Sequence, residues 1–170
     1  MSGMDDPGKH TNETDQVTVH IAAPPEVVYA LVTDITRTPE LDPEVRGGAW
    51  QAGVPGPAVG ARFRIVRERA GRTWKTDFMV VVARPGRDFA VTDADRHTGT
   101  VVWRYRMEPD GTGTRLTQSY EVTKAGTMVG RFILQRRHGA GDRRAARKQN
   151  MRETLERIRA VAESSDSEQR

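Results

Sequence analysis

The 170-residue sequence contains no cysteine, which excludes disulfide bonds, thiolate metal ligands and a cysteine nucleophile. It also lacks any apolar run of the roughly 18 residues that a membrane-spanning helix requires. The N-terminal stretch does not have the basic and then apolar order of a secretory signal peptide, so a cytoplasmic location is expected. A chain of this length is expected to form one domain with an adequate core.

Lysine is also scarce, since only four of the 27 basic residues are lysine and the other 23 are arginine. Arginine favours planar anionic partners, but a bias spread over the whole chain is more typical of GC-rich coding DNA than of a site. The local balance is more informative. From Arg131 to Arg159 ten basic residues accompany three acidic ones, although the whole chain carries a formal net charge of only +4. The basic character is therefore concentrated in the C-terminal part.

Aromatic residues are few, with three Trp, three Tyr and four Phe, and most lie in segments where apolar and polar residues alternate. Such alternation predicts strands of a sheet that has one apolar and one hydrated face. The expected strands cover about 17–21, 48–52, 61–69, 73–83, 88–92, 100–108 and 114–122. The turns between them, above all Pro109–Gly113, predict an antiparallel meander.

Helical patterns precede and follow this run of strands. Pro24 and Pro25 suit a first helical turn, and the apolar residues that follow, up to Ile35, have helical spacing. Short helices are expected at 38–41 and 128–137. A long C-terminal helix, which Asp142 can cap, is indicated by the stripe Met151, Leu155, Ile158 and Ala162. The polar segments 1–15 and 164–170 are expected to be disordered tails, which leaves one domain at 16–163.

Several short motifs accompany this element order: Ile21–Asp34, Pro39–Glu40, Pro43–Val45, Gly56–Phe63, Pro85–Ala90, Trp103–Tyr105, Gly113–Thr117 and Asn150–Leu155. Together they resemble the START-like, Bet v 1-like (SRPBCC) superfamily, and within it the polyketide cyclase/dehydratase group. The resemblance covers roughly residues 17–162. It departs from the family pattern at Leu41, where members often carry Trp. It implies an α+β helix-grip fold, in which a curved antiparallel sheet wraps around a long C-terminal helix and encloses a cavity.

The resemblance implies a small hydrophobic or aromatic ligand, similar to a polyketide or a lipid. Two functions stay open, because a fold does not define a reaction: an enzyme of aldol-type cyclisation and dehydration, or a non-catalytic carrier or sensor. A third is an interaction module that uses the basic C-terminal helix. Nucleic acid is not favoured as a partner, since no aromatic residues or recognition motif accompany the basic residues. No pattern requires a cofactor, and the oligomeric state stays open.

The alternation also predicts which side chains reach the cavity. Lys75 and Asp77 prefer water, so Trp74, Thr76, Phe78, Val80 and Val82 are expected to point inward. The same argument and the helical stripes give the expected ligand-binding set: Phe63, Trp74, Phe78, Phe89, Trp103, Gln118, Phe132, Lys148, Met151 and Leu155. For the apolar members, plain core packing is the alternative.

Four polar residues share the inward face: Arg67, Tyr105, Gln118 and Tyr120. A buried polar group needs a hydrogen-bond partner, so these residues either pair with one another or contact a ligand. A tyrosine hydroxyl near an arginine can donate a proton or a hydrogen bond to an enolate, as an aldol-type ring closure requires. Tyr105 and Tyr120, with Arg67 as charge partner, are therefore the candidate catalytic residues. Alternatively, the tyrosines bond at the strand ends and Arg67 lies at the rim.

Other chemistry has weaker support. The four histidines do not cluster, and the segment Asp93 to His97 is more typical of a solvated turn than of a metal site, so no metal is expected. Ser119 has no companion His or carboxylate that would suggest a catalytic triad.

Helical phase predicts that Lys148 and Arg144 lie nearer the cavity mouth than Arg143 or Arg147. There they can hold the carboxylate of a ligand; a solvated basic face is the alternative.

Overall fold

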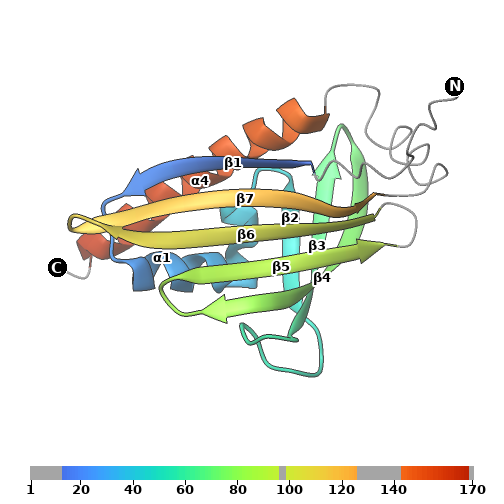
Figure 1. Cartoon of the computed structure of the whole chain (residues 1–170), viewed down its shortest axis with the longest axis horizontal. Helices are drawn as coiled ribbons and strands as arrows, with labels where there is room; N and C mark the ends of the chain where they lie inside the picture. Colours follow the sequence, from blue (N-terminus) through green and yellow to red (C-terminus); the bar gives the residue numbers. More distant parts are fainter. Residues whose placement is uncertain (1–12, 96–98, 126–142, 169–170) are drawn as a thin grey trace, which may run out of the picture.

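The computed structural model describes residues 13–95, 99–125 and 143–168 (Figure 1). In chain order its elements are β1 (Thr14–Ile21), α1 (Pro25–Thr33), the 3-10 helix η1 (Ile35–Arg37), α2 (Thr38–Leu41), β2 (Val45–Trp50), β3 (Arg62–Arg69), β4 (Arg72–Arg84), β5 (Asp88–Asp95), β6 (Gly99–Asp110), β7 (Gly113–Ala125) and α4 (Arg143–Glu168). The strands form one antiparallel sheet in the order β1-β7-β6-β5-β4-β3-β2. The predicted meander is confirmed, and β1 completes it by pairing with β7.

The sheet curves around the C-terminal helix. Figure 1 shows β2 and β3 running steeply across the direction of β5, β6 and β7, with α4 along the side of the sheet near β1. Helix α4 contacts β1, β7, α1 and α2. Its predicted apolar stripe is confirmed, because Met151, Leu155, Ile158 and Ala162 are all buried. This arrangement is the predicted helix-grip fold.

Local sequence explains how the chain turns from β1 into the short helices. Pro24 is the N-cap of α1 and Pro25 occupies its first turn, where a missing N–H is tolerated. Asp34 ends α1 and caps the next element, since its carboxylate accepts a hydrogen bond from the Thr36 N–H at 3.1 Å. Helix α2 follows at once, as predicted, and ends at Leu41. These short turns bring Asp42 beneath α4.

The core lies on the concave face of the sheet. Its buried strand residues include Phe63, Ile65, Phe78, Val80, Phe89, Met107 and Leu116, in the alternation that the sequence predicts. The expectation that Val82 points inward is wrong. A register irregularity between Val80 and Val82 shifts the alternation of β4, so that Ala83, opposite Phe89, packs against the core in place of Val82.

The expected tails are too long at both ends. β1 begins at Thr14, because Thr14 and Asp15 pair with Glu121 and Tyr120 of β7. Helix α4 extends to Glu168. Near its end the hydroxyls of Ser164, Ser165 and Ser167 each donate to the backbone carbonyl four residues earlier, Ser164 to Ala160 at 2.9 Å. The expected helix at 128–137, with Phe132, lies outside the described residues. In the ranges that the structure describes, no helix combines the length and apolarity needed to cross a bilayer.

Candidate functional site

A polar pair lies on the concave face of the sheet, where β6 and β7 adjoin. Tyr105 of β6 and Gln118 of β7 are opposite each other in register, and the Gln118 Nε2 donates to the Tyr105 hydroxyl oxygen at 3.1 Å. Gln118 is 6% exposed, whereas Tyr105 is half-buried against the core. The other amide atom, Gln118 Oε1, is buried without a hydrogen-bond partner in the described part of the chain. The pair therefore has unused hydrogen-bonding capacity.

The Tyr105 hydroxyl stays protonated far into the alkaline range. Burial is the main cause that raises the pKa of Tyr105, and the negative charge of Asp42 adds to it, while Arg67 and the Gln118 hydrogen bond oppose it. The hydroxyl proton has no acceptor among the described residues. At neutral pH Tyr105 is thus a hydrogen-bond donor on the concave face.

Arg67 is held by carboxylates rather than by the tyrosines. Its NH1 lies 3.2 Å from Asp42 Oδ2 and 3.9 Å from Glu44 Oε2. Asn150 of α4 donates to the other carboxylate oxygen of Asp42 at 3.0 Å. Arg67 therefore acts on Tyr105 only through its charge. The sequence did not identify Asp42 as a site residue. No motif spacing indicates its role, because it lies 25 residues from Arg67 and 108 residues from Asn150.

Tyr120 has a separate set of partners. It is 1% exposed, and its hydroxyl donates to Glu13 Oε1 at 2.7 Å. Arg147 binds the same oxygen at 3.1 Å and places its guanidinium 5.0 Å from the Tyr120 ring centroid. Burial, with a smaller effect of the Glu13 hydrogen bond, raises the pKa of Tyr120 to about 12. Its proton is already donated, so of the two predicted tyrosines only Tyr105 has a hydroxyl proton to offer.

These tyrosines allow a test by alkaline titration. The chain has three tyrosines, and burial raises the pKa of Tyr29 as well. A phenol whose pKa is higher in the folded state favours folding below its ordinary pKa of 10.0, and this contribution is lost as the pH rises through the folded-state value, about 12 for Tyr120. We expect the tyrosine titration followed by ultraviolet absorbance to lie at higher pH in the native protein than in the urea-unfolded chain, with the phase of Tyr120 near pH 12. Native and unfolded titrations that coincide would contradict this burial.

The basic start of α4 is paired with β1. Arg144 Nε and Lys148 Nζ lie 3.2 and 3.1 Å from the two oxygens of Asp15. Arg147, which was expected to lie farther from the cavity mouth than these two, also turns toward the sheet, where it contacts Tyr120 and Glu13. Asp15 and Glu13 were assigned to a disordered tail in the sequence, which concealed these partners. A role of Lys148 in ligand binding stays a prediction.

The predicted apolar lining divides into two groups. Phe63, Phe78, Phe89, Met151 and Leu155 are buried core residues, and the rings of Phe63 and Phe78 stack at 5.2 Å. Trp103, like Val91, is only partly buried and packs against that core, and Trp74 is also half-exposed. Trp103 and Val91, which are opposite each other and next to Tyr105 in the register, therefore mark a part of the concave face that solvent reaches.

One further carboxylate faces this region. Asp93 lies on the inward side of β5, opposite Phe78 and Val101, and its Oδ1 accepts the Val101 N–H at 3.0 Å. Burial raises the pKa of Asp93, and the Val101 N–H, Arg147 and Arg67 oppose this shift. Within the described ranges, no group of three or more His, Asp or Glu side chains is placed to hold a metal ion.

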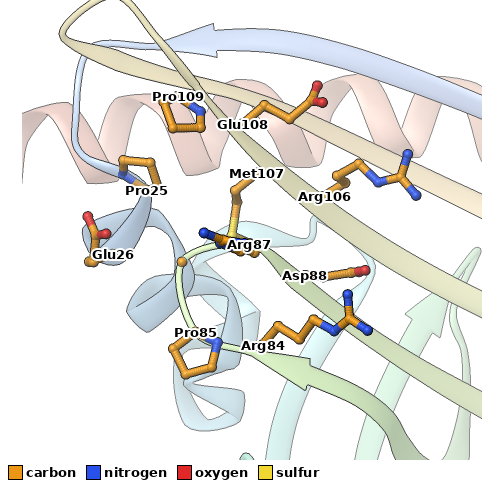
Figure 2. A pocket seen from close by; sticks show the side chains of 11 residues that line it. Pro25, Glu26, Arg84, Pro85, Arg87, Asp88, Arg106, Met107, Glu108 and Pro109 are labelled. Atoms are coloured by element: carbon orange, nitrogen blue, oxygen red, sulfur yellow. The ribbon is translucent and has the colours of Figure 1, made fainter.

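A depression of about 450 Å³ lies on the outer surface, where the start of α1 meets the β4–β5 turn and the end of β6 (Figure 2). Arginines and acidic residues both line it, and Figure 2 shows Asp88 between Arg84 and Arg106. The Asp88 carboxylate accepts a hydrogen bond from Arg104 Nε at 2.9 Å. The depression thus has a mixed polar and apolar lining and charges of both signs, and the concave face is the better candidate for binding a hydrophobic ligand.

Comparison with known proteins gives a consistent result. Residues 15–163 match the family described as "Polyketide cyclase / dehydrase and lipid transport". No curated protein matches the sequence. Among solved structures, the Polyketide_cyc-like protein Cgl2372 from Corynebacterium glutamicum is 34% identical, with a TM-score of 0.56, and the match covers 92% of this chain and 94% of that one.

Two more distant structures share the fold. The di-domain ARO/CYC StfQ from the steffimycin biosynthetic pathway is 15% identical with a TM-score of 0.72, and the match covers 91% of this chain and 51% of that one. This chain therefore spans about half the length of StfQ. The Zhui aromatase/cyclase from a Streptomyces species is 17% identical with a TM-score of 0.65, with 89% and 94% of the two chains covered.

Proposed function

Because the chain belongs to the polyketide cyclase/dehydrase and lipid transport family, we propose that it binds a small hydrophobic or aromatic ligand, similar to a polyketide or a lipid, on the concave face of the sheet. The observation that carries this proposal is the Tyr105–Gln118 pair, which combines a protonated hydroxyl and an unpartnered buried amide oxygen. A few convergent polar groups in apolar surroundings are typical of small-molecule sites.

The burial of the neighbouring residues supports the same face. Met107 and Leu116, next to the pair along their strands, are buried, whereas Val91 and Trp103 on the other side keep exposed surface. A flat apolar ligand that covers these side chains removes apolar area from water, at about 25 cal/mol for each Å². Its polar groups then lie beside Tyr105 and Gln118.

We further propose that the ligand is a substrate for aldol-type cyclisation. In such a closure an enolate carbon bonds to a ketone carbon, and the ketone oxygen takes up a proton as the π electrons move onto it. Tyr105 is suited to donate to this oxygen, with the positive charge of Arg67 nearby. The carbon between two carbonyl groups gives up its proton to water, so this closure needs no carboxylate beside Tyr105.

The alternative is a non-catalytic carrier or sensor that binds the same ligand on the same face. An interaction module based on α4 has less support, because Arg144, Arg147 and Lys148 are paired with carboxylates of β1. Native mass spectrometry of the purified protein, which detects a co-purified ligand, tests ligand binding directly. The mass of that ligand also distinguishes a lipid from an aromatic polyketide.

A variant of Tyr105 separates the two functions. For an enzyme, Tyr105→Phe is expected to abolish turnover of a linear poly-β-ketone and leave its affinity nearly unchanged. For a carrier, no turnover occurs, and the variant weakens binding of a ketone-bearing aromatic probe by about 0.5–1.5 kcal/mol, the value of one neutral hydrogen bond. Tyr29→Phe is the matched control, because Tyr29 packs edge-on against Phe89 in the core. Identical binding and turnover in both variants would refute a role for the Tyr105 hydroxyl.

A further inference from the structure

The unpartnered oxygen of Gln118 calls for an explanation. The side chain is 6% exposed and its Nε2 is fixed by the Tyr105 hydroxyl, so Oε1 cannot turn to solvent without breaking that bond. A buried carbonyl oxygen without a donor bears its full desolvation cost. Such groups are rare in native proteins and tend to mark a function or a bound molecule.

The neighbouring side chains of this face do not supply the missing donor. In register Gln118 lies between Val17 of β1, which has no polar atom in its side chain, and Tyr105 of β6. Along β7 the next inward residues are Leu116, which is apolar, and Tyr120, whose hydroxyl donates to Glu13. The donor for Gln118 Oε1 therefore has to come from outside this group of residues.

The pair offers a donor and an acceptor side by side. The Tyr105 hydroxyl donates, and Gln118 Oε1, on the same amide group that contacts this hydroxyl at 3.1 Å, accepts. We infer that Gln118 determines specificity, and that it selects ligands in which a carbonyl oxygen stands beside an O–H or N–H donor, as in an enolised dicarbonyl or a lactam. This inference rests on the proposed function, because it requires a ligand on this face. A ketone, ester or lactone without the donor leaves Gln118 Oε1 unsatisfied and binds more weakly.

A pair of isosteric compounds tests the inference. Phenanthridinone is a flat tricyclic lactam with an N–H beside its carbonyl, and benzochromenone is the corresponding lactone, in which a ring oxygen replaces the N–H. Isothermal titration calorimetry on the full chain is expected to show about tenfold tighter binding of the lactam, the value of one good hydrogen bond. N-methylphenanthridinone, which has lost the donor, is expected to bind as weakly as the lactone.

Two variants assign the preference to the side chain. Gln118→Met keeps the length and removes the amide, so it is expected to bind both compounds equally, mainly through weaker binding of the lactam. Ser119→Ala is the matched control, because Ser119 is the next residue of β7 and points to the opposite face of the sheet. It is expected to keep the tenfold preference. Circular dichroism confirms that each variant is folded.

The outcomes separate this inference from the function on which it rests. Equal binding of lactam and lactone by the unmodified chain, or a preference that Gln118→Met retains, overturns the inference and leaves ligand binding intact. Tighter binding of the lactone overturns it as well. Binding of none of the compounds overturns the proposed function and this inference together. The comparison with N-methylphenanthridinone needs no variant, so equal binding of the lactam and its N-methyl form overturns the inference even where Gln118→Met does not fold.

Discussion

Replacement of Asp42 by alanine is expected to lower the free energy of unfolding by about 3 kcal/mol, because a largely buried charge pair loses one partner. The Asp42 side chain is 11% exposed and that of Arg67 is 22% exposed. Asp42 accepts hydrogen bonds from Arg67 at 3.2 Å, from Asn150 at 3.0 Å and from the Glu44 N–H at 2.9 Å. All three donors lose their acceptor in Asp42→Ala, and the Arg67 charge is left with Glu44 at 3.9 Å.

Urea denaturation followed by circular dichroism measures this effect. Glu40→Ala, two residues earlier, is the matched control, since Glu40 forms an exposed ion pair with Arg37 whose loss is expected to be nearly silent. An Asp42→Ala protein as stable as the Glu40→Ala protein would show that the Asp42 contacts contribute nothing. The variant also removes one of the causes that raise the pKa of Tyr105, the charge of Asp42.

Gly48→Ala is expected to cost about 2–3 kcal/mol, the range for overpacking at a site that cannot relax. A Cβ at this position of β2 would press on the backbone carbonyl oxygen of Ile35 and stand 2.9 Å from Ile65 Cδ1. The carbonyl belongs to η1 and can yield only if that helix moves away from the sheet. Since η1 continues directly into α2, the strain also reaches the loop that holds Asp42.

Gly47→Ala provides the control for this prediction, because a Cβ on Gly47 meets no atom within 4 Å. The two variants add the same methyl group to neighbouring residues of one strand, so intrinsic strand preference affects both alike. Thermal and urea unfolding are expected to find Gly47→Ala close to the unmodified chain and Gly48→Ala clearly less stable. Equal stability of the two would mean that η1 moves without cost.

The sequence predicts the fold well where a short period carries the signal. Alternation along the strands identified the inward side chains from Phe63 to Tyr120, and the spacing of Met151, Leu155 and Ile158 gave the buried stripe of α4. The irregularity after Val80 was not predictable, because an extra residue in one strand leaves no mark in its own alternation. The start of β1 was missed because its polar residues pair with β7, which is distant in sequence. The end of α4 was missed because its serines bond to carbonyl groups of the preceding helical turn.

The candidate site was predictable as a set of residues but not as a set of contacts. Alternation placed Arg67, Tyr105, Gln118 and Tyr120 on one face, which the register supports. It could not show that Arg67 pairs with Asp42 while Tyr120 pairs with Glu13. Those choices depend on how the short helices and the first strand close over the sheet. Spacing along a single strand carries no information on them.

The pairing of the first strand with the last has a consequence for the order of folding during synthesis. Thr18 of β1 and Thr117 of β7 share a hydrogen bond across 99 residues of chain. At about 5–20 residues per second, β1 leaves the ribosome roughly 5–20 s before its partner strand exists. The strands β2 to β6 pair with sequential neighbours, so their part of the sheet can form during this interval. β1 is therefore expected to stay unpaired in the nascent chain until β7 has been made. It then joins the sheet together with α4 in the last steps of folding.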